Sequence, residues 1–307
     1  MGTTTQDTRN GASFLEAKPS DTRSTATDTF VDHAQQASHR ENGSSASTYE
    51  DSKPPHNKDT EAHPHHGPFG LQIAQWIRSP NWYSVETMDQ FLLWQLADSA
   101  FPSGGFAHSG GLESVAQWGL IRDHRDLLDY LPIALYAVRD GQLPFVNAVI
   151  SEPQEFEAVD RYCDAFLNSH VANRGSRRQG QSFLASAAKI FPVKEIQNIA
   201  ASAHATKQPR HLPTVFGAVC GQLGVEAQNA RRLFMFLSLR GWISSAVRLG
   251  IVGPIEGQSI QHSLGETCRS IADPFENTSI YSAAQCAPVL EVLQGTHDRM
   301  YSKLFQS

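Results

Sequence analysis

The sequence predicts an all-α protein, in which a single helical domain of roughly ten helices follows a disordered N-terminal tail. Two observations lead to this fold class. Apolar residues recur at helical spacing through most of residues 69–307, and no alternation of period two persists for the length of a strand. The chain has 307 residues, 40% of them hydrophobic, which is enough for one sizeable core.

Residues 1–68 form the predicted tail. They are rich in Ser, Thr, Asp, Gln and His and nearly lack Leu, Ile, Val and aromatic residues, so they cannot bury enough apolar surface to offset the entropy of ordering. The many acids argue against a transit peptide, and no apolar stretch suits a secretory signal. Within the tail, His63, His65 and His66 form a weak candidate metal site, because neighbouring imidazoles bind nickel or zinc. The alternative is a polar tail that happens to be rich in histidine.

Charge and cysteine usage argue against several classes of protein. The formal net charge of −6 leaves no basic surface for nucleic acid. The four cysteines include no CxxC pair, which argues against a structural zinc site and a disulfide-rich secreted domain, so we expect reduced thiols and a cytoplasmic protein. The apolar run over residues 233–249 contains Arg240 and Arg248 and is shorter than about 20 apolar residues, so it predicts a buried helix and no membrane span.

The elements follow in order along the domain. Residues 69–80 form an apolar segment expected to dock onto it. A helical pattern then runs to Asp98 and ends at Pro102, and a glycine-rich turn leads into a second helix near Leu112. Further helices are expected over residues 124–140, 142–150, 155–169, 182–191, 193–205, 211–225, 233–249, 258–271 and 288–305. Pro132 is expected to kink or break the first of these. Gly217 and Gly221 lie four residues apart and would let a neighbouring helix approach closely.

The connection over residues 98–111, here called the elbow, is the main candidate site. Its glycines permit positive φ, which we expect at Gly105, and Glu113 is placed to cap free amides of the second helix. Asp98 or His108 would then cap helix ends or satisfy buried backbone groups. The alternative is a main-chain surface presented to another protein, and the two roles are compatible.

Catalysis and nucleotide binding have weaker support. The types of residue found in a hydrolytic triad, Asp98, Ser103 and His108, occur in the elbow, but they lie within one turn, where a relay is hard to build. No GxxxxGK[ST], HExxH or GxSxG motif occurs. A second polar stretch, residues 173–181, contains Arg174, Arg177 and Arg178 and predicts either a solvated helix start or bidentate contacts with an acidic partner.

Four motifs, in order along the chain, resemble the UreF family of urease accessory proteins. They are the elbow with Phe106, His108 and Glu113; Asn173-Arg174-Gly175-Ser176 with Gln179-Gly180; His211 with Pro213 to Gly217; and Ser244 to Leu249 followed by Gly253-Pro254. Gly175 stands where the family usually has alanine. The resemblance covers about Met88 to Ser307. The sequence Val252-Gly253-Pro254 and the long N-terminal tail look more like the eukaryotic, plant or algal branch of the family.

The resemblance implies an all-α protein without catalysis of its own. It implies a homodimer that binds UreD (also called UreH), recruits the GTPase UreG and serves apo-urease, with nickel handled by the complex and no resident cofactor. The partner-binding residues that it implies are Asp98, Phe101, Pro102, Gly104, Gly105, Phe106, His108, Glu113, Arg174, Ser176, Gln179, Gly180, His211, Phe216, Gly217 and Arg248. Arg174 or Arg248 would meet UreG through a salt link rather than as an arginine finger. The alternatives are a helical hydrolase using Asp98, Ser103 and His108, or a His-rich metal-binding protein.

Overall fold

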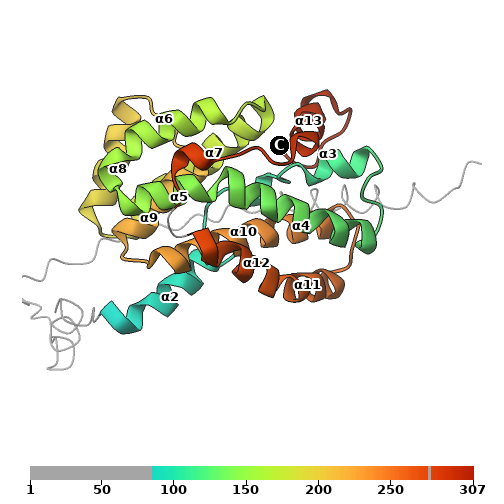
Figure 1. The fold of residues 1–307 in the computed structure, drawn as a ribbon, viewed down its shortest axis with the longest axis horizontal. Helices are drawn as coiled ribbons and strands as arrows, with labels where there is room; N and C mark the ends of the chain where they lie inside the picture. The colour runs from blue at the N-terminus through green and yellow to red at the C-terminus, as the bar shows by residue number, and fades with distance from the viewer. Residues whose placement is uncertain (1–84, 276–277) are drawn as a thin grey trace, which may run out of the picture. The chain divides into compact units, whose positions relative to one another are not determined.

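A computed structural model describes residues 85–275 and 278–307 and contains no strand within them (Figure 1). The α-helices are α2 (Val85–Ala97), α3 (Leu112–Gln117), α4 (His124–Gly141), α5 (Leu143–Ser151), α6 (Phe156–Phe166), α7 (His170–Ile190), α8 (Lys194–Ala205), α9 (Leu212–Gln222), α10 (Ala227–Arg248), α11 (Pro254–Ser263), α12 (Gly265–Ala272) and α13 (Pro288–Gly295). Short 3-10 helices are η2 (Gly105–Ala107), η3 (Pro153–Glu155), η4 (Asp273–Phe275), η5 (Ile280–Ser282) and η6 (Thr296–Arg299). The predicted all-α fold of roughly ten helices is confirmed.

Several predictions concern residues outside this range. The tail over residues 1–68, its imidazoles at His63, His65 and His66, and the apolar segment over residues 69–80 all lie outside the described residues. They stay predictions.

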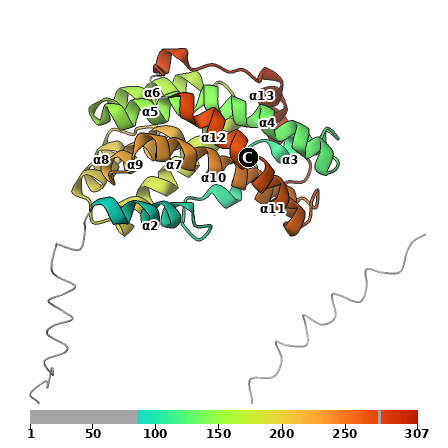
Figure 2. The ribbon, with the colours of Figure 1, turned by 60° about the horizontal axis from the view of Figure 1, so that its bottom comes forward.

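Helices α5, α7, α9 and α10 form the centre of the domain. In Figure 2, α9 and α10 lie between α2 on one side and α4, α5 and α6 on the other. Gly217 allows α9 to approach α5, because a Cβ at this position would lie 2.5 Å from the carbonyl oxygen of Val146. A Cβ at Gly221 would lie 3.6 Å from the Cα of Ile150. The close helix approach predicted for the two glycines is therefore confirmed.

A chain of phenylalanine rings connects the elbow to this core. Phe101 of the elbow packs on Phe183 of α7, with ring centroids 5.3 Å apart. Phe183 packs on Phe216 of α9 at 5.6 Å, and Phe216 on Phe234 of α10 at 5.1 Å. All four side chains are buried. The elbow is thus fixed to three central helices by aromatic packing, which contributes beyond the area that it buries.

The long apolar run lies in α10 and is largely buried. Leu233, Phe234, Met235, Leu239 and Ile243 all belong to the core. Among the described residues, no helix combines the length and the apolar character that crossing a membrane requires. The prediction of a buried helix is confirmed.

Some element boundaries differ from the prediction. The Asn173 to Gly180 motif lies inside α7, which begins at His170 after Ser169 accepts a hydrogen bond from the backbone N–H of Ala172. Pro132 lies inside α4 without ending it, because buried leucines on both sides hold the helix against the core. The segment expected as one helix over residues 258–271 is two helices, α11 and α12, that meet at Leu264.

The largest difference is at the C-terminal end. The predicted helix over residues 288–305 stops at Gly295, where the Thr296 hydroxyl donates to the carbonyl of Leu293 at 2.6 Å. Residues 296–307, here called the strap, then contact α3, α7 and the elbow in turn. Figure 1 marks the end of this segment close to α13 and α3. Polar contacts with other elements replace the helical hydrogen bonds there, and a helical period cannot reveal such contacts.

Candidate functional site

The elbow is held by α7 and by its own backbone. The hydroxyls of Ser182 and Ser186 donate to the carbonyl of Pro102 at 3.2 and 2.8 Å. The Asp98 carboxylate accepts from the backbone N–H of Ala100 at 2.8 Å, so it caps the turn that leaves α2. The polar groups at the start of the elbow therefore have local structural partners.

The positive φ angles fall on three glycines other than Gly105. Gly104, Gly110 and Gly111 have φ of 75°, 60° and 90°. Gly105 is not among the residues with positive φ, so the expectation of a left-handed backbone there was wrong. Two features exclude a side chain at Gly110: its positive φ angle, and the indole nitrogen of Trp242, which would lie 2.7 Å from a Cβ.

His108 points into the protein and contacts the strap. Its Nδ1 lies 2.5 Å from the hydroxyl of Ser307, and its side chain is buried. Burial lowers the pKa of His108 to about 4, with smaller contributions from Arg178, Arg174 and His297. The imidazole is therefore neutral at pH 7 and serves as a hydrogen-bonding group for the strap.

Glu113 also binds the strap. Its buried carboxylate accepts from the backbone N–H groups of Leu304 and Phe305 at 2.5 and 3.2 Å, and it lies 3.0 Å from Nε2 of His297. Glu113 was predicted to cap the free amides of α3. It instead accepts from backbone amides of the strap, about 190 residues further along the chain. The carboxylate thus fixes the path of the strap.

The strap makes further contacts with α7 and the elbow. Arg174 donates to both carboxylate oxygens of Asp298 at 2.7 and 3.0 Å, and this guanidinium lowers the pKa of Asp298 to about 2. The backbone N–H of Gln306 donates to the carbonyl of Ala107 at 2.8 Å, and that of Ser109 donates to Ser307 at 2.7 Å. Arg174 is therefore engaged within the chain.

Arg248 joins the elbow, α10 and the strap at the surface. Its guanidinium lies 3.8 Å from the centroid of the Phe106 ring and 4.2 Å from that of Phe305, and it donates to the carbonyl of Phe106 at 2.5 Å. The Phe106 side chain is 72% exposed. Such an arrangement presents an aromatic face and a cation side by side, which is typical of binding surfaces.

A second group of predicted residues lies inside the protein. In what we call the His211 node, the buried His211 contacts Asp164 at 2.9 Å and Ser176 at 3.1 Å through its two ring nitrogens. The carboxylate of Asp160 accepts from the backbone N–H of His211 at 2.8 Å and from the Thr214 hydroxyl at 2.6 Å. Burial lowers the pKa of His211, although the hydrogen bond with Asp164 opposes this.

The remaining members of that group are packing residues. Phe216 and Gly217 are buried in α9, and Gly180 of α7 faces the main chain at Arg210, where a Cβ would overlap the carbonyl oxygen. Four predicted partner-binding residues (Gly180, His211, Phe216 and Gly217) are therefore buried, and Ser176 is bonded to His211. These residues could therefore affect the binding of a partner only indirectly, by stabilising the fold that carries the surface.

The residue types of a hydrolytic triad do not bond to one another. Asp98 is bonded to Ala100, the Ser103 hydroxyl accepts from the backbone N–H of Gly105 at 3.4 Å, and His108 contacts Ser307. Within the described residues, no group of three or more His, Cys, Asp or Glu side chains is placed to hold a metal ion. The observed contacts therefore fix the elbow instead of forming a relay.

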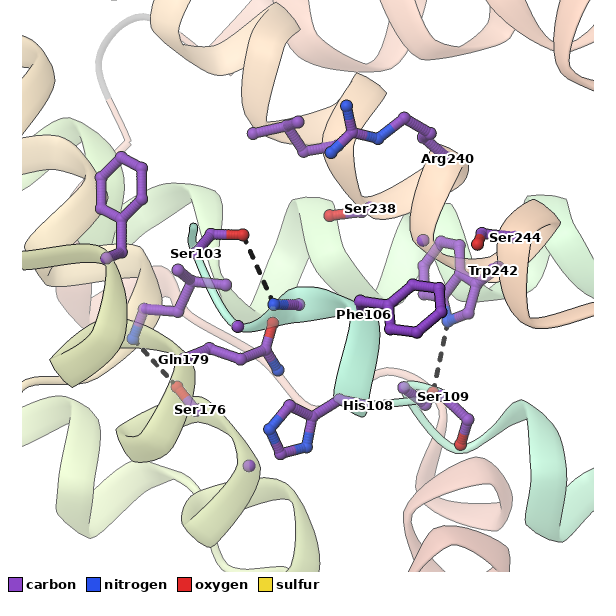
Figure 3. A pocket seen from close by; sticks show the side chains of 18 of the residues that line it. Ser103, Phe106, His108, Ser109, Ser176, Gln179, Ser238, Arg240, Trp242 and Ser244 are labelled. Atoms are coloured by element: carbon purple, nitrogen blue, oxygen red, sulfur yellow. Dashed lines mark hydrogen bonds between the residues drawn. The ribbon is translucent and has the colours of Figure 1, made fainter. Parts of the chain in front are cut away.

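A cavity of about 440 Å³ lies between the elbow, α7 and α10 (Figure 3). Ser103, Phe106 and His108 line it from the elbow, and Gln179 lines it from α7. From α10 come Ser238, Arg240, Gly241, Trp242 and Ser244. Sequence reasoning missed Arg240 and Trp242 as site residues, and it also missed the strap residues, because only tertiary contacts bring them to the elbow.

Fold and site together define a helical protein whose candidate surface is a glycine-rich elbow closed by a C-terminal strap. The chain belongs to the UreF family: the UreF family model matches residues 121–265, and relatives named urease accessory protein F are matched over most of their length. It is 34% identical over 223 residues to urease accessory protein F of Arabidopsis thaliana, covering 71% of this chain and 92% of that protein. It is 32% identical over 230 residues to urease accessory protein F of Oryza sativa subsp. indica, with coverages of 72% and 88%. A further relative, urease accessory protein UreF of Trichodesmium erythraeum, is 29% identical over 225 residues, with coverages of 71% of this chain and 96% of that protein.

Proposed function

We propose that the chain is a scaffold in the maturation of urease. It binds a UreD/UreH-like protein and a UreG-like GTPase, and it positions them so that nickel passes to apo-urease. The chain itself catalyses no reaction, works in the cytoplasm and forms a homodimer. The observation that carries the proposal is family membership with relatives named urease accessory proteins, over most of the length of those relatives.

The site chemistry supports a binding role. Phe106, Arg178, Arg248, Leu304 and Gln306 make up what we call the elbow surface. Arg248 stacks on Phe106 and also on the buried Phe305, which follows the exposed Leu304 in the strap, and Arg178 donates a hydrogen bond to Gln306 at 3.3 Å. Exposed aromatic and arginine side chains are the residue types that most often dominate protein interfaces.

The contacts of the arginines restrict how a partner is met. Arg174 is paired with Asp298, and Arg248 is stacked between two rings, so neither extends into solvent as a free finger. We therefore expect Arg248 to keep its conformation when a partner binds. A carboxylate of the partner would approach the edge of the guanidinium group beside Phe106.

The experiment that tests the proposal is a pull-down of the full chain with the UreD-like and UreG-like proteins of the same organism, with and without GTP. We expect Phe106→Ala to reduce retention of a partner by at least about tenfold, because truncating an aromatic anchor that the partner buries on binding costs more than about 1.4 kcal/mol of binding free energy. Its melting temperature should stay close to that of the parent chain.

Ile255→Ala is the matched control. Ile255 lies on α11 and is 85% exposed, so the variant removes an exposed apolar side chain away from the elbow. It should retain both partners. If the parent chain retains neither partner, or if a strain without the gene keeps normal urease activity, the proposed function is wrong. Equal losses in Phe106→Ala and Ile255→Ala would refute the elbow surface alone.

A further inference from the structure

The cavity behind the elbow has an unbalanced charge. Among the described side chains that line it, one is a guanidinium, that of Arg240, and none is a carboxylate, lysine or thiol. The other charged lining candidate, His108, is neutral at pH 7 because burial lowers its pKa to about 4. The side chains of the lining therefore favour an anion or a neutral molecule over a cation.

Arg240 differs from the paired arginines of the chain. Arg174 and Arg232 each lie 2.7 Å from a carboxylate oxygen, of Asp298 and Asp273. Within the described residues, Arg240 has no carboxylate at ion-pair distance, and one of its nitrogens donates to the backbone carbonyl of Ala97. Burial lowers the pKa of Arg240 more than the charge of Asp98 raises it. A partly desolvated cation without a counter-ion favours the binding of an anion.

The rest of the lining separates into a polar part and an apolar part. Ser103 and Gln179 lie on the elbow and α7 sides of the cavity (Figure 3), and the Gln179 amide has no hydrogen bond within the described structure. The apolar part is made of aromatic and aliphatic side chains: Phe101, Phe183, Phe216, Phe234, Leu237 and Trp242. The volume of about 440 Å³ is within the range of about 300–1,000 Å³ typical of small-molecule sites.

We propose that this cavity binds a small amphipathic monoanion, with its carboxylate on Arg240 and its apolar body against the phenylalanine rings. A single guanidinium balances one negative charge, so a dianion such as phosphate would bring a second charge without a partner into a poorly solvated site. Ser103 and Gln179 supply neutral donors for the second carboxylate oxygen. This ligand site goes beyond the proposed scaffold function and does not depend on it.

Titration calorimetry on the full chain tests the proposal with three probes: octanoate, octanol and inorganic phosphate. Octanoate should bind saturably at one site per chain. Octanol, which keeps the apolar body but lacks the charge, should bind at least about tenfold more weakly, because it loses a charge-assisted hydrogen bond. Phosphate at the same concentration should give no saturable heat. Absence of octanoate binding, or phosphate binding as tightly as octanoate, would overturn the proposal.

Two variants locate the site. Arg240→Gln should weaken octanoate binding at least about tenfold and leave octanol binding unchanged. Gly241→Leu should abolish the binding of both, because the glycine lines the cavity and a Cβ there meets no atom within 4 Å, which leaves room for a larger side chain to start at this position and occupy the ligand space. Gly265→Leu is the control, since a Cβ at Gly265 also meets no atom within 4 Å and this residue does not line the cavity. Octanoate binding that survives Gly241→Leu, or is lost equally in Gly265→Leu, would place the ligand elsewhere and refute the site.

Discussion

The elbow and the His211 node are built in opposite ways. In the node, buried carboxylate, imidazole and hydroxyl groups bond to one another, and glycines allow main chains to touch. In the elbow, an exposed phenylalanine and a stacked arginine lie at the surface, and the strap covers the polar groups beneath them. Both regions carry UreF-like motifs, so a residue can belong to a family signature because it holds the fold or because it forms a surface. A residue that holds the fold should lower the free energy of unfolding when it is replaced, whereas a surface residue should not.

The largest effect is expected in the node, at Gly180. The Cβ introduced by Gly180→Ala would overlap the carbonyl oxygen of Arg210, and both partners are main chain of packed segments that cannot move independently. We expect a loss of about 3 kcal/mol or more in the free energy of unfolding. Urea denaturation followed by circular dichroism measures it.

Gly241→Ala is the matched control for Gly180→Ala. Gly241 is also inside a helix, but a Cβ there meets no atom within 4 Å. We expect it to gain about 0.5–1 kcal/mol, because alanine loses less conformational freedom than glycine in a helix. Similar stabilities for the two variants would show that α7 is not tightly packed at Gly180.

The next effect concerns Asp160, whose carboxylate accepts from the backbone N–H groups of Arg210 and His211 and from the Thr214 hydroxyl, at 2.6, 2.8 and 2.6 Å. Asp160→Ala leaves the two backbone N–H groups without this acceptor at a buried position, whereas the Thr214 hydroxyl keeps the carbonyl of His211 at 2.9 Å. We expect a loss of about 2–3 kcal/mol, read from the same denaturation curves. Glu157→Ala on the exposed side of α6, which removes only the surface pair with Arg161, should change stability by less than about 1 kcal/mol.

The glycines of α9 and the carboxylate of Asp160 show how much of this packing can be predicted from the sequence. The spacing of Gly217 and Gly221 predicted a close helix approach, because a helical period converts sequence distance into a shared face. The role of Asp160 cannot be predicted in this way. An acidic residue on an amphipathic helix looks the same in the sequence whether it faces solvent or binds three donors, and here the donors lie 50 to 54 residues further along the chain. The same limit applies to the elbow: Phe106 and His108 were found from the motif, whereas Asp298, Phe305 and Arg240 reach the site only through tertiary packing.

A smaller effect is expected from the paired glycines of the elbow. Gly104 has φ of 75°, whereas Gly105 is not among the positive-φ residues and a Cβ there would lie 3.4 Å from the Ser103 hydroxyl. Gly104→Ala should therefore lose about 1–2 kcal/mol, and Gly105→Ala should be nearly neutral. Calorimetric melting of the two variants provides the comparison. A loss in Gly105→Ala equal to that in Gly104→Ala would contradict the backbone described for the elbow.

The last effect is a pH dependence that connects the elbow to the strap. Burial lowers the pKa of His108 from 6.5 to about 4, with further lowering by Arg178, Arg174 and His297, so the folded state binds this proton less readily than the unfolded chain does. By linkage, the stability contribution is complete above pH 6.5 and is lost as the pH falls toward 4. In His108→Gln, which keeps a polar group near Ser307, the fall in stability between pH 6.5 and 4 should be shallower than in the parent chain. The hydrogen-exchange protection factor of the Gln306 amide, which donates to the carbonyl of Ala107, should then no longer fall over this range, because the variant lacks the imidazole whose protonation we expect to weaken the contact with Ser307. Parallel pH profiles for the two proteins would mean that the strap is held without the neutral imidazole of His108.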